Sequence, residues 1–298
     1  MKRQLPLLIA PALVAFGFST ASAITVDGSE SGEYPSAVAT QDNQTNFGDS
    51  NIGAVDFANG SEIDEAYGVI GGGSLFLMLG GNLESNYNKL EIFIDSVTGG
   101  QNKLRGDNAD VDFNGLNRMG DDGSGNGLTF DAGFEADYYM MLTGGDDGGG
   151  NYQAFCNFAD LPTGGGGVGT FVGGGVGTQF LGQALGISFA INNSNTAGVG
   201  AGAGLDNGAG VTTGSEFEIP LSAIGNPSGC VEVIAFINGG SHDFLANQVL
   251  GGLGGLDNLG EPRNVNFDSI AGTQSFTVCP GPVPVDQASW GQIKSQYR

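Results

Sequence analysis

The chain has 298 residues, of which 9 are basic and 32 acidic, and its formal net charge is −23. This charge argues against nucleic acids and anionic membranes as partners, because both would be repelled. It favours divalent cations as ligands, although solubility alone would also explain it. Glycine contributes 56 residues, and its clusters alternate with short apolar segments. That arrangement is typical of a β-protein with long connections and not of a collagen or a disordered chain.

The beginning of the chain has the pattern of a secretory signal peptide. Lys2 and Arg3 precede a short apolar run, and Ala21-Ser22-Ala23 forms an A-x-A cleavage site. We predict residues 1–23 as the signal peptide. An uncleaved membrane anchor is the alternative, but the apolar run is short for a span. The mature chain is therefore expected to be exported from a bacterium, secreted or at the cell surface, with no membrane span.

Short apolar segments bounded by turn residues predict nine strands. A triple glycine between the first two indicates a hairpin. The segment "KLEIFIDSV" alternates, with Leu90, Ile92 and Ile94 on one face and Glu91, Phe93 and Asp95 on the other. The predicted strands are residues 66–70, 74–83, 89–97, 137–143, 151–158, 185–194, 215–221, 230–239 and 274–278.

This strand count, with almost no helical periodicity, predicts an all-β fold. We expect an antiparallel two-sheet β-sandwich, jelly-roll-like, with long glycine-rich loops, over residues 24–279. Residues 280–298 read as a proline-rich spacer and a short tail with the single Trp290. The tail is either a frayed terminus or a sorting or anchoring signal.

Three cysteines leave one unpaired if a disulfide forms, and export permits one. Cys230 begins one predicted strand and Cys279 ends the last, which makes them the preferred pair. Pairings that include Cys156 stay open.

The segment "DVDFNGLNRMGD" matches the calcium loop D-x-[DN]-x-[DN]-G at its first six positions. It predicts a structural Ca²⁺ site, because calcium takes six to eight oxygen ligands. Arg118 at the ninth position and the lack of flanking helices depart from an EF-hand, and an ordinary acidic turn is the alternative. The ligands would be Asp110, Asp112, Asn114, the Leu116 carbonyl and Asp121.

No catalytic set is evident in the sequence. The G-x-S-x-G and H-E-x-x-H motifs are absent, and the only histidine, His242, stands in a loop where we expect it to be solvated. We therefore predict no catalytic residues, no site for an organic cofactor and no enzymatic activity.

Several segments together resemble exported β-sandwich domains of the DOMON-like group, which includes family 9 carbohydrate-binding modules. They are "ITVDG" with "EYPSAVA", "DEAYGVIGGGSLFLMLGGNL", "KLEIFIDS", and "EFEIPLSAIG" at Glu216 to Gly225. The resemblance implies a sandwich that binds sugars or haem. Haem would need an axial ligand such as His242. Sugars would need aromatic rings, and the candidates are Tyr67, Tyr87, Tyr138, Tyr139 and Tyr152.

The combined expectation is a secreted, non-enzymatic, calcium-stabilised sandwich that binds a glycan or another cell-surface polymer at the cell surface or in the extracellular matrix. The alternative is a purely structural surface or matrix protein that self-associates and binds no small molecule. A concave sheet face with two or more exposed aromatic rings would favour the first, and an exposed edge strand the second.

Overall fold

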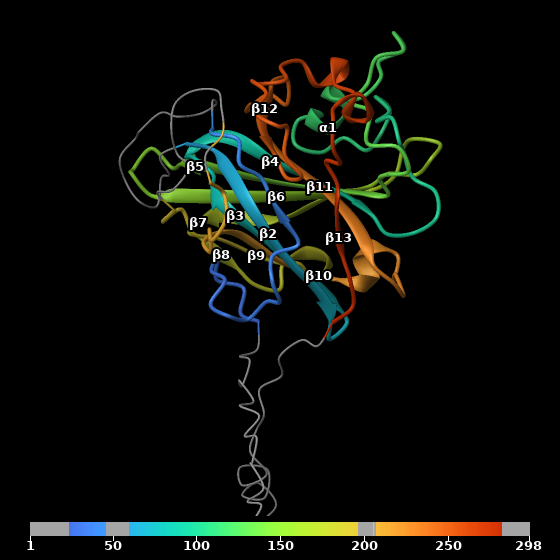
Figure 1. Ribbon diagram of the computed structural model, residues 1–298. Helices are drawn as coiled ribbons and strands as arrows, with labels where there is room; N and C mark the ends of the chain where they lie inside the picture. Colours follow the sequence, from blue (N-terminus) through green and yellow to red (C-terminus); the bar gives the residue numbers. More distant parts are fainter. Residues whose placement is uncertain (1–23, 46–59, 196–204, 206, 282–298) are drawn as a thin grey trace, which may run out of the picture.

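The computed structural model describes residues 24–45, 60–195, 205 and 207–281, and it is an antiparallel two-sheet β-sandwich (Figure 1). The fold class predicted from the sequence is confirmed. The predicted signal peptide and residues 282–298 of the predicted tail lie outside the described residues. Within the described part of the chain, no helix is long and apolar enough to cross a membrane.

The first sheet has six strands, and its centre is the predicted hairpin. β2 and β3 pair in register across a turn in which Gly72 and Gly73 have φ values of 62° and 91°. Residues with side chains rarely adopt such angles, so glycine is required at this turn. The strand order is β1 (Ala39–Thr40), β2 (Glu62–Gly71), β3 (Ser74–Asn82), β10 (Gly214–Pro220), β9 (Ser188–Ile191) and β8 (Gln179–Phe180).

The second sheet has seven strands. Its first six follow the order β12 (Leu245–Val249), β11 (Val231–Asn238), β4 (Asn86–Asp95), β5 (Tyr138–Asp146), β6 (Tyr152–Asp160) and β7 (Gly169–Val176). The seventh, β13 (Phe276–Val278), also pairs with β11. The helical turns are α1 (Gly115–Arg118), η2 (Ala184–Gly186), η3 (Leu221–Ile224), η4 (Pro262–Asn264) and η5 (Phe267–Ser269).

The main core lies between the two sheets and follows the alternation predicted for β4. Leu90, Ile92 and Ile94 are buried in it, opposite the inward side chains of β3. The side chains contributed by β3 are Leu75, Leu77 and Leu79.

The other face of the seven-stranded sheet carries a second core, which the sequence did not predict. Phe93 of β4 packs on Phe130, with ring centroids 4.8 Å apart, and on Tyr139 of β5. Phe130 comes from the long segment between β4 and β5, and Phe267 from η5 packs nearby on Phe236. Loops therefore form a third layer over part of this sheet, and the alternate residues of β4 are buried on both faces.

Two of the segments that carry the family resemblance contact each other. The Glu216 carboxylate in β10 accepts hydrogen bonds of 2.8 Å from the backbone N–H groups of Asp27 and Gly28 and from the hydroxyl of Tyr34. Burial raises the pKa of Glu216 to about 7, against the opposing effect of these donors. The N-terminal segment is thus fastened to the outer face of the first sheet.

All nine predicted strands exist, and four further strands were missed: β1, β7, β8 and β12. β1 and β8 have two residues each. β7 has the sequence GTFVGGGV, whose glycine content suggests a loop and not a strand.

The preferred disulfide is confirmed: Cys230 and Cys279 are bonded, and Cys156 is a free, buried thiol in the main core. The bond joins the residue before β11 to the residue after β13, which pair with each other. It closes a loop with a sequence separation of 49 residues.

Removing this disulfide should lower the free energy of unfolding by about 2–4 kcal/mol, because the cross-link restricts the unfolded chain. The measurement is urea unfolding of the mature protein and of a Cys230→Ser, Cys279→Ser variant, each with and without a reductant. Reductant should shift the midpoint of the wild type only. An equal shift in the variant would contradict the assignment.

Candidate functional site

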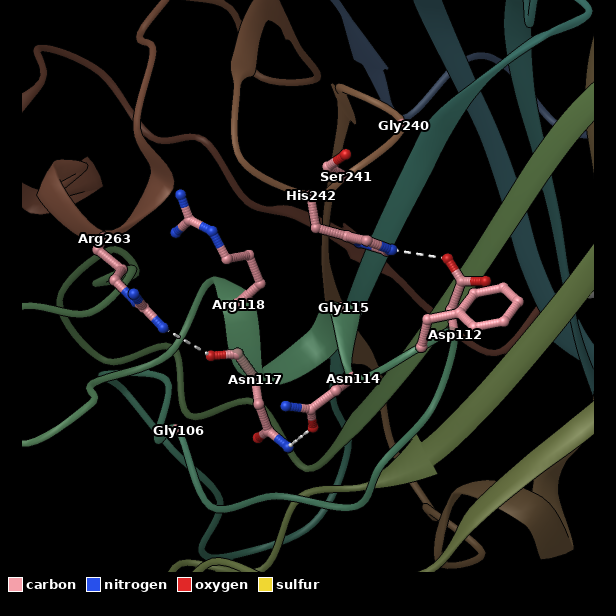
Figure 2. Close-up of a pocket in the computed structure, with 11 residues that line it drawn as sticks. Gly106, Asp112, Asn114, Gly115, Asn117, Arg118, Gly240, Ser241, His242 and Arg263 are labelled. Atoms are coloured by element: carbon pink, nitrogen blue, oxygen red, sulfur yellow. Dashed lines mark hydrogen bonds and ion pairs between the residues drawn. The ribbon is translucent and has the colours of Figure 1, made fainter.

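Two pockets meet on the loop-covered face of the seven-stranded sheet, and both include Asp112 and Phe113. The first, here called the arginine pocket, has a volume of about 530 Å³ (Figure 2). The second, here called the aromatic groove, has a volume of about 500 Å³. The arginine pocket is lined mainly by Asn114, Asn117, Arg118, Ser241, His242 and Arg263. The aromatic groove is lined by Tyr87, Lys89, Thr143, Gln153, Phe155, Asn157 and Phe171.

A buried network of charged groups lies where the pockets meet. His242 Nδ1 is 2.7 Å from Glu91 Oε1, and its Nε2 is 2.7 Å from Asp112 Oδ2, the contact drawn in Figure 2. Lys89 Nζ is also 2.7 Å from Asp112 Oδ2. Glu91 accepts a further hydrogen bond of 2.7 Å from the hydroxyl of Tyr139. Two carboxylates thus face two cationic groups in a largely buried site.

The expectation that His242 is solvated is wrong, since its side chain is 3% exposed. Burial lowers the pKa of the imidazole, but the carboxylates of Glu91 and Asp112 outweigh that effect and raise the pKa to about 9. At neutral pH the ring is therefore an imidazolium that donates from both nitrogens. Neither nitrogen is free to bind a haem iron or to activate the neighbouring Ser241.

The turn that carries Asp112 has an unusual backbone. Asp112, Phe113 and Asn114 have φ values of 46°, 55° and 66°, three consecutive left-handed residues that are not glycine. For Phe113 this conformation costs roughly 1–2 kcal/mol, and it costs less for Asp112 and Asn114, because Asp and Asn adopt this region more readily. The bonds from Lys89 and His242 to Asp112 hold the turn in place. Left-handed strain of this kind concentrates at binding and catalytic sites.

Gly115 is required next to this turn by its contact with His242. A Cβ atom at position 115 would lie 2.1 Å from Cδ2 and Nε2 of the imidazole. The ring therefore packs directly against the backbone at the start of α1. The lone histidine and this glycine together fix the loop between β4 and β5 to the loop that follows β11.

The strained turn presents Phe113 to solvent. Its side chain is 102% exposed, and its ring stands between the two pockets. A fully exposed phenylalanine held in a costly conformation contributes nothing to the cores. A contact with a ligand or partner would account for both the exposure and the strain.

The floor of the aromatic groove is formed by outward-facing residues of β5 and β6. Phe155 and Asn157 alternate with the core residues Ala154 and Cys156. Asn157 is 8% exposed and lines the groove. Its side-chain amide makes no hydrogen bond with the described residues, but it is not one of the fully buried atoms that lack a partner. Its position in the groove provides a donor and an acceptor for a ligand.

Further polar groups and rings line the sides of the groove. Gln153 Nε2 donates a 2.6 Å hydrogen bond to the hydroxyl of Tyr87, which is 41% exposed, while Phe171 is 57% exposed. Of the tyrosines proposed as sugar contacts, Tyr87 alone lines the groove. Tyr67, Tyr139 and Tyr152 are buried in the cores, and Tyr138 stacks on Phe158.

The cations of the arginine pocket are already engaged by protein groups. Arg118 makes a two-pronged ion pair with Glu261, with nitrogen–oxygen distances of 2.7 and 2.5 Å. Arg263 donates to the carbonyls of Gly120 and Asn117 and lies 3.2 Å from Asp122. These contacts attach η4 to the segment around α1. The two arginines therefore stabilise the contact between these loops, and their charges are not available for binding an anion.

The residues proposed as calcium ligands have separate surroundings in the structure. Asp112 faces Lys89 and His242, and the Asn114 side-chain oxygen accepts a hydrogen bond from Asn117. Leu116 is buried in α1, and Asp110 is exposed. Asp121 accepts bonds from the N–H groups that follow it and lines a different pocket. Over the described ranges, no three His, Cys, Asp or Glu side chains form a group arranged for a metal.

Comparison with known proteins assigns no relative: no family model, no curated protein and no solved structure matches the chain.

The His242 network predicts a specific dependence of stability on pH. The imidazole has an unfolded pKa near 6.5 and a folded pKa of about 9, so its contribution is complete below the first value and is lost as pH rises through the second. The wild type should become less stable over this interval, by roughly 3 kcal/mol from this group. Thermal unfolding at successive pH values measures the loss.

The matched variant for this experiment is His242→Gln, which keeps a polar side chain but does not titrate. It should be less stable than the wild type below pH 6.5, with the difference shrinking toward pH 9. Comparison with the variant cancels the titration of Glu216 and other groups. Parallel stability curves for the two proteins would contradict the role assigned to His242.

The calcium prediction is tested by calorimetric titration of the mature protein with Ca²⁺ and by melting curves with EDTA. Because Lys89 and His242 already neutralise Asp112, we expect EDTA to leave the melting temperature unchanged. Saturable binding that is lost in Asp110→Ala would contradict this expectation and establish a calcium loop. Asp146→Ala, in a separate acidic turn, is the control.

Proposed function

We propose that the protein is a secreted, non-enzymatic glycan-binding β-sandwich of the bacterial cell surface or extracellular matrix, with the aromatic groove as its binding face. The observation that carries the proposal is the combination in one groove of exposed aromatic rings with the side-chain amide of Asn157. The resemblance to DOMON-like and carbohydrate-binding domains supports the same class of ligand.

The chemistry of sugars matches this combination. A pyranose ring has apolar C–H faces, which pack on flat aromatic side chains, and hydroxyl groups around its edge, which need hydrogen-bond partners. In the groove, Phe113 and Phe171 supply exposed rings. Asn157 supplies an amide that can both donate and accept. Gln153 supplies an acceptor oxygen, because its Nε2 already donates to Tyr87 and to the carbonyl of Asp146. Such sites combine apolar walls with a few placed polar groups.

The preformed backbone also favours binding. Phe113 is held by a turn whose conformation is fixed by buried charges, so little conformational freedom remains to be lost when a ligand packs on it. Nothing in this binding requires a metal, so the proposal does not depend on the outcome of the calcium titration. The alternative, a structural protein with no small ligand, would leave both the exposure of Phe113 and the Asn157 amide in the groove without a role.

Replacing Phe113 by alanine should weaken glycan binding about tenfold, because losing one stacked ring costs roughly 1–1.5 kcal/mol and 1.4 kcal/mol is a factor of ten. Asn157→Ala should have a comparable effect. The measurement is calorimetric titration with cellohexaose, chitohexaose, xylohexaose and maltohexaose, and pull-down on the corresponding polymers.

The matched control is Phe244→Ala, which removes another exposed ring, 40% exposed, that lines neither pocket. It should bind as the wild type does. Melting temperatures of all three variants establish that each remains folded. The proposal fails if the wild type binds none of these glycans, or if Phe113→Ala and Asn157→Ala bind as tightly as the wild type.

A further inference from the structure

The edge of the seven-stranded sheet at β7 differs from the other sheet edges. β1 and β8, at the two ends of the first sheet, have two residues each. At the far end of the second sheet, β12 and β13 have five and three residues, and Leu245 of β12 also bonds to Gly260. Short or covered edges are how proteins avoid pairing with other chains. β7, by contrast, runs for eight residues.

The outer edge of β7 has free backbone groups, although Gln183, next to η2, lies against the strand at Gly173. Among the described residues, β7 pairs only with β6, and no hydrogen bond joins its second edge to another backbone segment. The strand contains neither proline nor a charged residue, the two kinds of residue that usually protect an exposed edge. At Gly175, near the end of the strand, an added Cβ atom would meet no other atom within 4 Å.

The surface around this edge is mostly apolar, with Asp107 and Asp160 beside Gly165 and Gly167 before the strand begins. Residues 161–205 contain no charged side chain, in a chain whose net charge is −23. Much of the exposed large apolar surface lies in the same stretch. Its exposed large apolar side chains are Val168, Phe171, Val176, Leu181, Leu185 and Leu205, with exposures of 68, 57, 60, 58, 46 and 62%.

The charge distribution indicates what kind of partner this edge fits. Two copies of so acidic a chain repel each other over most of their surfaces, but not where the surface is neutral. A basic partner would instead be drawn to the acidic faces. We propose that a second copy of this chain docks on β7, edge to edge and antiparallel, to form a dimer.

Such a dimer would close on itself. Two identical edges that pair in antiparallel fashion are related by a two-fold axis. Each β7 edge then pairs with the other, so no edge is left for a third copy and the assembly stops at a dimer. The two second sheets become one continuous sheet across the interface. Because Phe171 of β7 lines the aromatic groove, the two grooves would lie on the same face of that sheet.

The test is sedimentation velocity of the mature protein from micromolar to near-millimolar concentration. We expect a concentration-dependent monomer–dimer equilibrium that persists at high salt, where screening weakens the repulsion between copies. In amide hydrogen exchange, residues 169–176 should gain protection as the concentration rises. This pattern would distinguish strand pairing from other kinds of contact.

Val168→Asp and Leu181→Asp place a charge on the neutral surface outside the groove, and each should shift the protein to monomer. Leu256→Asp, at a residue that is 47% exposed and lies outside the neutral stretch, is the matched control and should leave the dimer intact. A monomer at every concentration would overturn the proposal. A dimer unaffected by both edge variants, or no added protection of β7, would overturn it as well.

Discussion

The structure around the groove depends on charges buried on the outer face of β4. Glu91 has no exposed surface, and Lys89 and Asp112 are nearly as buried. Isolated charges in such a place would cost several kcal/mol each. They persist because a histidine from the loop after β11 and an aspartate from the loop after β4 complete the set. The network therefore fastens two distant loops to the sheet, and the strained turn with Phe113 follows from it.

Much of the fold was predictable because short stretches of sequence determine it, through alternating apolar residues and glycine-containing turns. The alternation in "KLEIFIDSV" identified both faces of β4, and the triple glycine identified the β2–β3 hairpin. The disulfide followed from the positions of Cys230 and Cys279 at strand ends. The strands that were missed are very short or, like β7, so rich in glycine that local propensity argues against a strand.

The site was harder to predict, because its contacts join residues far apart in the sequence. The sequence singled out Asp112 as a metal ligand, and the structure adds Lys89 and His242 as its partners, the latter 130 residues away. The one available signal was the alternation itself, which puts Lys89 and Glu91 on the same face of β4 as Phe93. Only the loop layer, with its own apolar core, turns that face from a solvated surface into a buried one.

The packing of His242 on Gly115 restricts how this sequence can change. A side chain at position 115 would overlap the imidazole, while loss of the imidazole would leave Glu91 and Asp112 without their shared cation. A substitution at either position alone should therefore destabilise the protein. Substitutions at the two positions should show strong epistasis, with a larger residue at 115 tolerated only after 242 has become smaller. The two loops would then evolve as one unit, although more than 120 residues separate them in the sequence.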